Sequence, residues 1–588
     1  MDSKHVTEST SGQEDIQKTW WKEAIIYQIY PRSFQDSDGD GIGDLNGITS
    51  RLDYIQSLGV DIIWLNPIFL SPNDDNGYDI SDYREIMREF GTMEDFDRLL
   101  KEIHKREMRL VLDLVVNHTS DEHPWFEEAR KSRHNPYYNY YHWWPAEKGE
   151  PPLRLSYFDE EGNAWTYNKP TDSYYLHYFS RKQPDLNWEN PEVRQEIFDM
   201  MRFWFDKGID GFRMDSISLI AKDPSFPLID SKKYPDIFSF YAKEPRLHLY
   251  LHEMNRQVLS KYDCMSVGEG SAVMVDDVAK FVDPAREELN MLYHFDAARI
   301  RNTTLPDNPE SGIDYSLIAL KKMFTEWDKA VDKGWPSIYL GNHDQPRMVS
   351  RFGSDKDEFR ALSAKMLITF LLTMRGTPYW FAGDEIGMRN IRFDRIEDYN
   401  DIDTINRYKK AKAEGKDPQA VLDEQKETGR DNARTPFQWD RSPETGFTAG
   451  TPWLKVNPDY TWINVADEEK DPTSILNYFK KVVSFRKENP SLIYGSYHLL
   501  DAENPQCYIF LRKTRADTYL IMLNFSPKAA ISTPGIDMSN AHVLLDNYGD
   551  RSHMAPQKDI TLRPFEAIVF QLNHPVYESF IDSLDLLE

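Results

Sequence analysis

The segment Gly208-Ile209-Asp210-Gly211-Phe212-Arg213-Met214-Asp215 starts with a turn residue and continues as a short apolar run that ends in two charged residues. Successive side chains of a strand point to opposite faces, so Arg213 and Asp215 share one face. Arginine keeps its proton, and a carboxylate held beside it is expected to stay ionised with a lowered pKa. The segment therefore predicts a buried strand with a charged carboxylate at its end, although an isolated pair of this kind is more often a structural ion pair.

Apolar runs of this kind recur along the chain, with helical patterns between them. The eight runs span residues 24–30, 61–68, 109–116, 210–217, 265–268, 289–295, 336–340 and 377–382. Between the second and third runs, apolar residues from Phe96 to Ile103 repeat at helical spacing, and Thr92 is a candidate N-cap. Strands that alternate with helices in this way predict an α/β fold, a parallel (β/α)8 TIM barrel.

Two long insertions and a change in the pattern of apolar residues indicate how the chain is divided into domains. The segment 119–178 is rich in Trp, Tyr, Pro and His and is expected to form an inserted subdomain after strand 3, above the barrel mouth. A charged insertion, 388–470, follows the eighth run. From residue 490 onward, short alternating runs predict a C-terminal antiparallel β-sandwich. The predicted division is a disordered N-terminus (1–18), a barrel (19–118 and 179–489), the inserted subdomain (119–178) and the sandwich (490–588).

Composition restricts the class of ligand and the location of the protein. A formal net charge of -27 argues against nucleic acid and against an anionic membrane surface, because both would repel the chain. Two cysteines cannot form a disulfide framework. The first residues lack the apolar core of a secretory signal, and no run reaches the length of a membrane span. We therefore expect a cytoplasmic protein without membrane contact, a monomer, that binds a small neutral molecule.

Polar residues follow several of the apolar runs. In a (β/α)8 barrel the chemistry takes place at the C-terminal ends of the strands, so these residues are expected to meet at one rim. They are Tyr78 and Asp79 after the second run, Asp113, Asn117 and His118 at the third, Arg213 and Asp215 at the fourth, Glu269 at the fifth, and Asn342, His343 and Asp344 at the seventh. Each alone is more often a strand cap or a core residue. Their presence at matching strand ends favours a shared site.

Four motifs resemble the signature regions of the α-amylase superfamily, glycoside hydrolase family 13. They are Asp113-Leu-Val-Val-Asn117-His118, Gly211-Phe-Arg213-Met-Asp215, Gly268-Glu269 and Asn342-His343-Asp344, in that order. Residues 183–187, Gln-Pro-Asp-Leu-Asn, resemble the marker of the oligo-1,6-glucosidase subgroup, which includes α-glucosidases. The resemblance implies that Asp215 is the nucleophile, Glu269 the general acid/base and Asp344 the transition-state stabiliser. It implies these contacts to the sugar: Tyr78, Asp79, His118, Phe179, Arg213, Ser216, His343 and Arg430.

The residues fit the chemistry that the resemblance implies. A retaining glycosidase needs one ionised carboxylate and one protonated carboxyl about 5 to 5.5 Å apart. Asp215 beside Arg213 suits the first role, and Glu269 follows apolar residues that favour the uncharged form. A pocket closed at one end admits only a chain end. We therefore expect an exo-acting retaining α-glucosidase that releases terminal glucose from maltose-, isomaltose- or sucrose-type substrates through a covalent intermediate.

An acidic loop, residues 36–44, has the spacing of a calcium site. It places side-chain oxygens at positions 1, 3, 5 and 9, but position 12 is Gly47 instead of the glutamate of an EF-hand. Related glucosidases bind Ca²⁺ at this place, and the resemblance implies a structural Ca²⁺, or Mg²⁺, without a role in the chemistry. Its ligands would be Asp36, Asp38, Asp40, the carbonyl of Ile42, and Asp44. A solvated acidic turn is the alternative.

Two other functions stay open. Sucrose isomerases and transglucosylases of the same subgroup transfer the glucosyl group to another sugar hydroxyl. The isomerases carry an R-L-D-R-D segment after strand six, where residues 299–303 here read Arg-Ile-Arg-Asn-Thr and keep only the first arginine. Non-catalytic relatives, the heavy chains of amino-acid transporters, have lost the catalytic residues and have a membrane anchor. This chain keeps those residues and shows no anchor.

Ser216, directly after the proposed nucleophile, bears on the choice of linkage. In relatives of the subgroup, valine at this place goes with α-1,6 preference, and threonine or alanine goes with α-1,4 activity. Serine is small and carries a hydroxyl like threonine. We therefore expect useful activity on α-1,4 or sucrose-type bonds, with the insertion 119–178 as the alternative selector.

Overall fold

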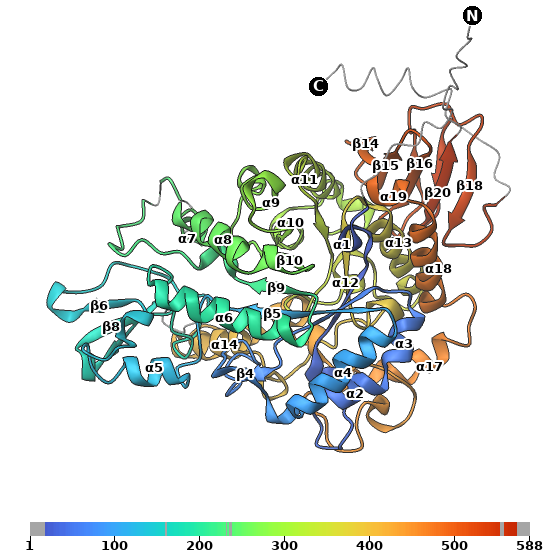
Figure 1. Cartoon of the computed structure of the whole chain (residues 1–588). Coiled ribbons are helices and arrows are strands. Elements are labelled where there is room, and N and C mark those ends of the chain that lie inside the picture. Colours follow the sequence, from blue (N-terminus) through green and yellow to red (C-terminus); the bar gives the residue numbers. More distant parts are fainter. Residues whose placement is uncertain (1–17, 159–161, 231, 235–237, 553–557, 573–588) are drawn as a thin grey trace, which may run out of the picture.

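The computed structural model describes residues 18–158, 162–230, 232–234, 238–552 and 558–572, and Figure 1 shows how its elements are arranged. Of the N-terminal segment predicted to be disordered, residues 1–17 lie outside this part of the chain.

The predicted parallel barrel is confirmed. Eight strands form one parallel sheet in the order β11-β10-β9-β5-β2-β1-β13-β12. They are β1 (Ile26–Ile29), β2 (Ile62–Leu65), β5 (Arg109–Val115), β9 (Gly211–Asp215), β10 (Met265–Glu269), β11 (Met291–Tyr293), β12 (Ser337–Ile338) and β13 (Thr377–Phe381). Each coincides with one of the apolar runs, and β10 continues past its run to Glu269. Ser337 on β12 donates a 2.6 Å hydrogen bond to the main-chain oxygen of Leu292 on β11, so the two end strands lie side by side and nearly close the ring.

Local signals in the sequence set the ends of the helices. α4 (Met93–Lys105) begins at the predicted cap, Thr92, which forms a capping box. α6 (Pro191–Lys207) begins after Asn190 and ends at Gly208, whose φ of 108° suits glycine. The other helices of the barrel part are α1 (Trp20–Glu23), α2 (Leu45–Ser50), α3 (Leu52–Ser57), α8 (Arg246–Gln257), α9 (Ala279–Val282), α10 (Asp296–Thr303), α11 (Leu317–Ala330), α12 (Met348–Phe352), α13 (Arg360–Thr373) and α18 (Ile475–Glu488). Across the described ranges, no helix is both long enough and apolar enough to cross a membrane.

Two insertions lie beside each other. The first contains α5 (Pro124–Ala129) and an antiparallel sheet in the order β6-β8-β7, with β6 (Trp143–Pro145), β7 (Trp165–Asn168) and β8 (Ser173–Leu176); it occupies the left edge of Figure 1. The second contains α14 (Ile402–Ala413), α15 (Pro418–Thr428), α16 (Asp431–Arg434) and α17 (Val465–Glu468). Smaller elements are β3 (Phe69–Leu70), β4 (Asp82–Ile86) and α7 (Phe238–Tyr241). Asn406 on α14 donates a 2.7 Å hydrogen bond to the main-chain oxygen of Phe158, which joins the two insertions.

The C-terminal part is antiparallel, as predicted. Five strands pair in the order β14-β15-β16-β20-β18, and β17 pairs with β19. Their bounds are β14 (Ser496–Leu500), β15 (Cys507–Lys513), β16 (Thr518–Asn524), β17 (Ala530–Ser532), β18 (His542–Asp546), β19 (Ile560–Leu562) and β20 (Ala567–Leu572). One face of the larger sheet, with Phe510 and Ile521, belongs to the same apolar core as the barrel helices. The other face, with Leu511 and Leu520, packs on the two-stranded layer. In Figure 1 this part lies next to α13 and α18.

Two buried arginines bond to the end of α13, and one of them, Arg512, comes from the C-terminal sheet. Arg486 on α18 donates to the main-chain oxygens of Leu372 and Met374, at 2.8 and 2.9 Å. Arg512 on β15 donates to the main-chain oxygen of Thr373 at 2.6 Å. The last carbonyls of a helix have no partner within it, so these guanidinium groups satisfy the end of α13. Burial lowers the pKa of Arg486 to about 9.

Candidate active site

Three barrel strands bring three carboxylates to one guanidinium. Arg213 on β9 is fully buried, and its Nη1 lies 2.7 Å from Asp113 Oδ1 on β5 and 2.9 Å from Asp215 Oδ1. Its Nη2 contacts Oε2 of Glu269 on β10. Because parallel register places residue 213 beside Asp113, the sequence positions of these groups and the pairing of the strands fix the cluster. One positive charge thus faces three acidic groups.

The charge state of Asp215 differs from the prediction. Burial and the negative charge of Glu269 raise the pKa of Asp215 well above its usual range, and Arg213 opposes them. The predicted lowering of this pKa is wrong, because burial has the largest influence on the group and Arg213 also contacts two other carboxylates. Asp215 and Glu269 thus form an acidic pair on neighbouring strands, and Arg213 contacts both members.

Asp344, from the loop after β12, has a different environment. Its Oδ1 lies 2.9 Å from Arg434 Nη2 and 3.2 Å from Arg430 Nη1, and its Oδ2 lies 3.1 Å from His343 Nε2. Burial alone would raise the pKa of Asp344, but the neighbouring positive groups outweigh it and hold the pKa well below its usual range. Burial lowers the pKa of His343 to about 3, so this ring is neutral near pH 7. The two arginines therefore keep Asp344 ionised.

Aromatic rings line the space beside these carboxylates. Tyr78 stacks on His343 with ring centroids 5.3 Å apart, and its hydroxyl lies 2.7 Å from His343 Nε2 and 3.0 Å from Asp113 Oδ2. His118 lies against Phe179 at a centroid distance of 5.0 Å. Burial lowers the pKa of His118 to about 3, so it is also neutral near pH 7. The structure thus brings the predicted Tyr78, His118, Phe179 and His343 to one rim.

Asp79 is turned into its own loop. Its carboxylate accepts hydrogen bonds from the main-chain N–H groups of Asp74 and Asp75, at 2.9 and 3.0 Å, and from Ser71 Oγ at 3.0 Å. Burial raises the pKa of Asp79 to about 7. Asp75 instead faces the site, with its Oδ1 3.3 Å from Nη2 of Arg430. Sequence reasoning missed Asp75, for which the only signal was its place in an acidic pair before Gly-Tyr-Asp.

Ser216 has an unusual backbone. Its φ of 43° and ψ of 30° place it in the left-handed region, which few residues other than glycine adopt. Its main-chain N–H points at Glu269 Oε2, at 3.3 Å. The residue is 3% exposed and lies between β9 and the turn that follows. The turn after β9 therefore also contacts Glu269 on β10.

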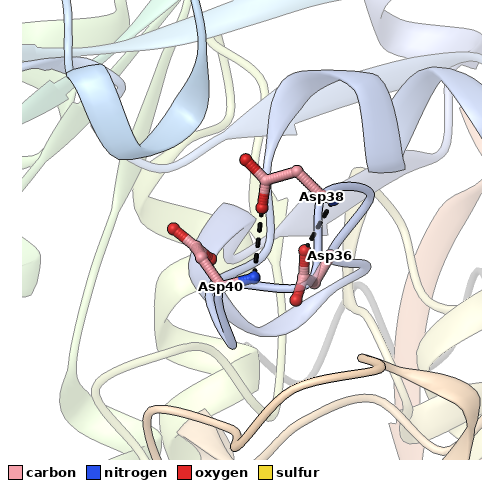
Figure 2. A group of neighbouring side chains, drawn as sticks. All are labelled: Asp36, Asp38 and Asp40. Carbon is pink, nitrogen blue, oxygen red and sulfur yellow. Dashed lines mark hydrogen bonds between the residues drawn. The ribbon is translucent and has the colours of Figure 1, made fainter.

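The acidic loop brings three predicted metal ligands together. Asp36, Asp38 and Asp40 each offer an oxygen within 4.8 Å of the others, and Figure 2 shows their carboxylates around one turn. Two hydrogen bonds drawn there, from Asp38 N to Asp36 Oδ1 at 2.9 Å and from Asp40 N to Asp38 Oδ1 at 3.2 Å, hold the turn. Asp44 caps α2 by accepting from Gly47 N at 2.7 Å. A cluster of hard oxygen donors fits Ca²⁺ or Mg²⁺.

A (β/α)8 barrel that carries two neighbouring carboxyl groups and an ionised third carboxylate at its strand ends has the arrangement that a glycoside hydrolase needs. The comparisons with known proteins agree, and the predicted family is confirmed. The chain belongs to the alpha-amylase family, since residues 28–495 match its catalytic domain.

Individual relatives cover almost the whole chain. An oligo-1,6-glucosidase of Parageobacillus thermoglucosidasius is 51% identical over 95% of this chain and 100% of its own length. Another, of Bacillus cereus, is 48% identical over 95% and 100%. Among solved structures, a variant of the trehalulose synthase MutB in complex with Tris has a TM-score of 0.89 and 42% identity, and covers 94% of this chain and 100% of its own. The chain is therefore similar to both hydrolases and sucrose-converting enzymes.

Proposed function

We propose that the protein is an exo-acting, retaining α-glucosidase of the oligo-1,6-glucosidase type. It hydrolyses terminal, non-reducing α-linked glucose from short oligosaccharides or from disaccharides of the maltose, isomaltose or sucrose type. The observation that carries the proposal is the pair of Asp215 and Glu269, whose carboxyl groups contact one guanidinium at the ends of neighbouring strands.

The presence of two neighbouring carboxyl groups supports the two roles that retention requires. With substrate bound, Glu269 carries a proton, and the ionised Asp215 attacks the anomeric carbon. As the carbon–oxygen bond breaks, its electrons stay on the leaving oxygen, which takes the proton from Glu269. In the second half, Glu269 takes a proton from water, and the water oxygen displaces Asp215 from the carbon. Arg213 contacts both carboxyl groups. The negative charge that passes from Asp215 to Glu269 therefore stays beside the same guanidinium.

Asp344 supplies a fixed negative charge for the transition state. The reacting sugar ring gains positive charge as the bond breaks. Asp344 is kept ionised by Arg430 and Arg434. A preorganised charge of this kind stabilises the transition state without rearrangement.

Arg430 and Asp75 would form the closed end of the sugar pocket. Arg430 bridges Asp75 and Asp344, at 3.3 and 3.2 Å, and lies 4.9 Å from the centre of the Phe158 ring. Phe158 belongs to the first insertion and Arg430 to the second, so their contact supports a pocket that admits only a chain end. Asp75 takes the role that the sequence assigned to Asp79. His118, His343, Tyr78 and Phe179 would form its walls.

The acidic loop would hold a structural metal ion. Asp36, Asp38 and Asp40 supply carboxylate oxygens, and the carbonyl of Ile42 with Asp44 would complete the shell. Ca²⁺ suits a flexible shell of many oxygens better than Mg²⁺, which needs near-octahedral geometry. The loop leads from β1 to α2, away from the carboxyl pair in sequence, so the ion would stabilise the first strand–helix connection. A monomeric state and a cytoplasmic location stay predictions from the sequence.

Transfer to a sugar hydroxyl is the second candidate function. It is favoured by the fold match to a trehalulose synthase and an isomaltulose synthase, both with a TM-score of 0.89. A variant of the trehalulose synthase MutB has been solved with its substrate sucrose, and one glucosyl intermediate would serve both outcomes. The segment 299–303, which keeps only Arg299 of the isomerase pattern, argues for water as the acceptor.

One assay separates these functions. Purified protein is incubated with maltose, isomaltose, sucrose and trehalose, and the products are identified by chromatography. Release of free glucose supports the α-glucosidase. Isomaltulose or trehalulose from sucrose supports the transferase. If none of the four sugars is consumed, the proposed substrate class is wrong.

A further inference from the structure

The two oxygens of Glu269 have different neighbours. Oε2 faces the guanidinium of Arg213 and the main-chain N–H of Ser216. Oε1 accepts a 2.9 Å hydrogen bond from the hydroxyl of Ser271, two residues further along the chain. Guanidinium and amide N–H groups only donate hydrogen bonds, whereas a hydroxyl both donates and accepts. A proton on Glu269 therefore belongs on Oε1, beside Ser271.

The main chain around Ser271 is held from two directions. Its carbonyl accepts a 2.8 Å hydrogen bond from Ser218 Oγ, in the turn that follows β9. The preceding residue, Gly270, donates from its N–H to the main-chain oxygen of Tyr293 on β11, at 2.7 Å. Ser271 is thus fixed relative to the strand of the nucleophile and to the next strand of the barrel. Its hydroxyl has a defined place beside Oε1.

We propose that Ser271 is a positioning residue for the acid–base step. This inference rests on the proposed function, and in it Ser271 affects the reaction only through Glu269. When Oε1 gives its proton to the leaving oxygen, the bond between that oxygen and the anomeric carbon breaks, and Asp215 forms the new bond to carbon. Glu269 is left as a carboxylate, and the Ser271 hydroxyl turns to donate to Oε1. A hydrogen bond to a charged acceptor is stronger than one to a neutral acceptor, so Ser271 stabilises the form of Glu269 that the step creates.

The inference predicts a loss that depends on the leaving group. Phenyl α-glucoside needs protonation of its leaving oxygen, whereas dinitrophenyl α-glucoside leaves as a stable anion without it. The value of kcat/KM reports the first chemical half for both. Ser271→Ala should lower kcat/KM for the phenyl substrate about tenfold or more, as expected for one lost charge-assisted hydrogen bond. For the dinitrophenyl substrate we expect a change within about twofold, because no acid is needed.

Two further variants make the test specific. Ser271→Thr keeps the hydroxyl and should restore most of the activity on the phenyl substrate. Ser266→Ala removes a buried hydroxyl from the strand of Glu269, where it contacts Asn290 and no carboxylate, and should leave the ratio of the two substrates unchanged. Equal losses on both substrates for Ser271→Ala, or no rescue by threonine, would overturn the inference.

Glu269→Gln separates failure of the inference from failure of the proposed function. If Glu269 is the acid, this variant loses activity on the phenyl substrate and keeps much of the first step on the dinitrophenyl substrate. If it loses both equally, or neither, the proposed role of Glu269 is wrong whatever Ser271 does. If Glu269→Gln behaves as expected and Ser271→Ala does not, only the inference on Ser271 fails.

Discussion

At the scale of single residues, Arg213 has the largest effect on the charge of the site. One guanidinium contacts Asp113, Asp215 and Glu269. Burial raises the pKa of Asp113 to about 6, although Arg213 lowers it. The balance between burial and the charge of Arg213 therefore sets the charge of Asp113 in this cluster.

Asp215→Asn should abolish turnover and leave the fold intact. The two side chains have nearly equal volume, and only the nucleophilic charge is lost. We expect kcat to fall about a thousandfold or more, measured with maltose, while the circular dichroism spectrum and the Tm stay close to those of the wild type. A variant that keeps a tenth of the activity would remove Asp215 from the nucleophile role.

Ser216→Val should lower the ratio of kcat/KM for maltose to that for isomaltose. A change of one or two methyl groups in a pocket is worth about 1 to 3 kcal/mol in discrimination. The left-handed backbone of Ser216 adds a second effect, since a β-branched residue is strained there, and the Tm should fall as well. Ser216→Ala is the matched control because it changes polarity without branching. An unchanged ratio in both variants would point to the insertion 119–178 as the selector.

The sequence placed the proposed catalytic carboxylates Asp215 and Glu269 at one rim because each directly ends a strand, where alternation fixes the direction of a side chain. The sequence did not indicate the direction of the Asp79 side chain, because side chains in a loop follow no regular alternation. Asn73, Asn76 and Gly77 have φ values of 66°, 48° and 101°, so the loop reverses between Asp75 and Asp79. The pKa of Asp215 also could not be predicted, since Arg213 has a further partner, Glu269, that lies 56 residues away in sequence.

Elements with local signals were predicted well. The cap of α4 at Thr92 and the stop of α6 at Gly208 depend on residues within one turn of the helix end. The acidic loop is also local, and its three clustered aspartates were all identified. The strands β17 and β19 were not, because they are three residues long and pair with each other across a long stretch of intervening chain.

Removal of metal by a chelator should lower the Tm without changing the active site. An ion that binds only the folded loop stabilises the fold by mass action, by about 2.7 kcal/mol at a hundredfold excess over Kd. Added Ca²⁺ should restore the Tm, and Mg²⁺ should restore it less. Asp38→Asn is a useful comparison, because it removes one carboxylate of the cluster and should reduce the response to Ca²⁺. Identical melting of metal-free protein with and without either ion would make the loop a simple acidic turn.

Asp384, in the turn after β13, should make stability depend on pH. Burial raises its pKa to about 7, against the opposing charge of Arg347. The folded chain thus keeps a proton that the unfolded chain has lost above about pH 4. This contribution to stability is fully present below that pH and is lost as the pH rises through about 7.

Asp384→Asn mimics the protonated form at every pH. Relative to wild type, it should therefore gain about 2 to 3 kcal/mol of stability between pH 5 and pH 8, at about 1.4 kcal/mol per pH unit of the pKa difference. Thermal unfolding at the two pH values measures this difference. Asp332→Asn, at an exposed position, is the control. Parallel pH curves for wild type and Asp384→Asn would show that Asp384 does not titrate in this range.

At the scale of the whole molecule, the barrel and the antiparallel C-terminal part were both predicted. Both predictions came from the number of apolar runs and from the change in their spacing along the chain. What could not be predicted is that the two parts share one core, in which Phe510 and Ile521 of the C-terminal sheet pack with barrel helices. This packing brings together residues that are far apart in the sequence, and no local sequence pattern connects them. The proposed bounds of the domains stay predictions.

Arg512→Met should destabilise the whole protein. It keeps the apolar stem but removes the donors that satisfy the end of α13 and the carbonyl of Gly495. Buried carbonyls left without partners cost about 1 to 3 kcal/mol each, so we expect a loss of about 2 to 4 kcal/mol, seen as a lower Tm. Arg515→Met, in the exposed turn after β15, is the control and should change the Tm little. If both variants melt like wild type, the buried arginine does not join the two parts.

The position of Arg512 in the chain has a consequence for how the protein is made. A ribosome releases the barrel strands and α13 long before it adds residue 512. Until then, the end of this helix lacks a partner that the finished molecule provides. A nascent chain that already contains Asp215, Glu269 and Asp344 therefore cannot complete this fold until the C-terminal strands have been added. Premature termination after the barrel would yield a chain with all its chemistry encoded and an exposed, incomplete core.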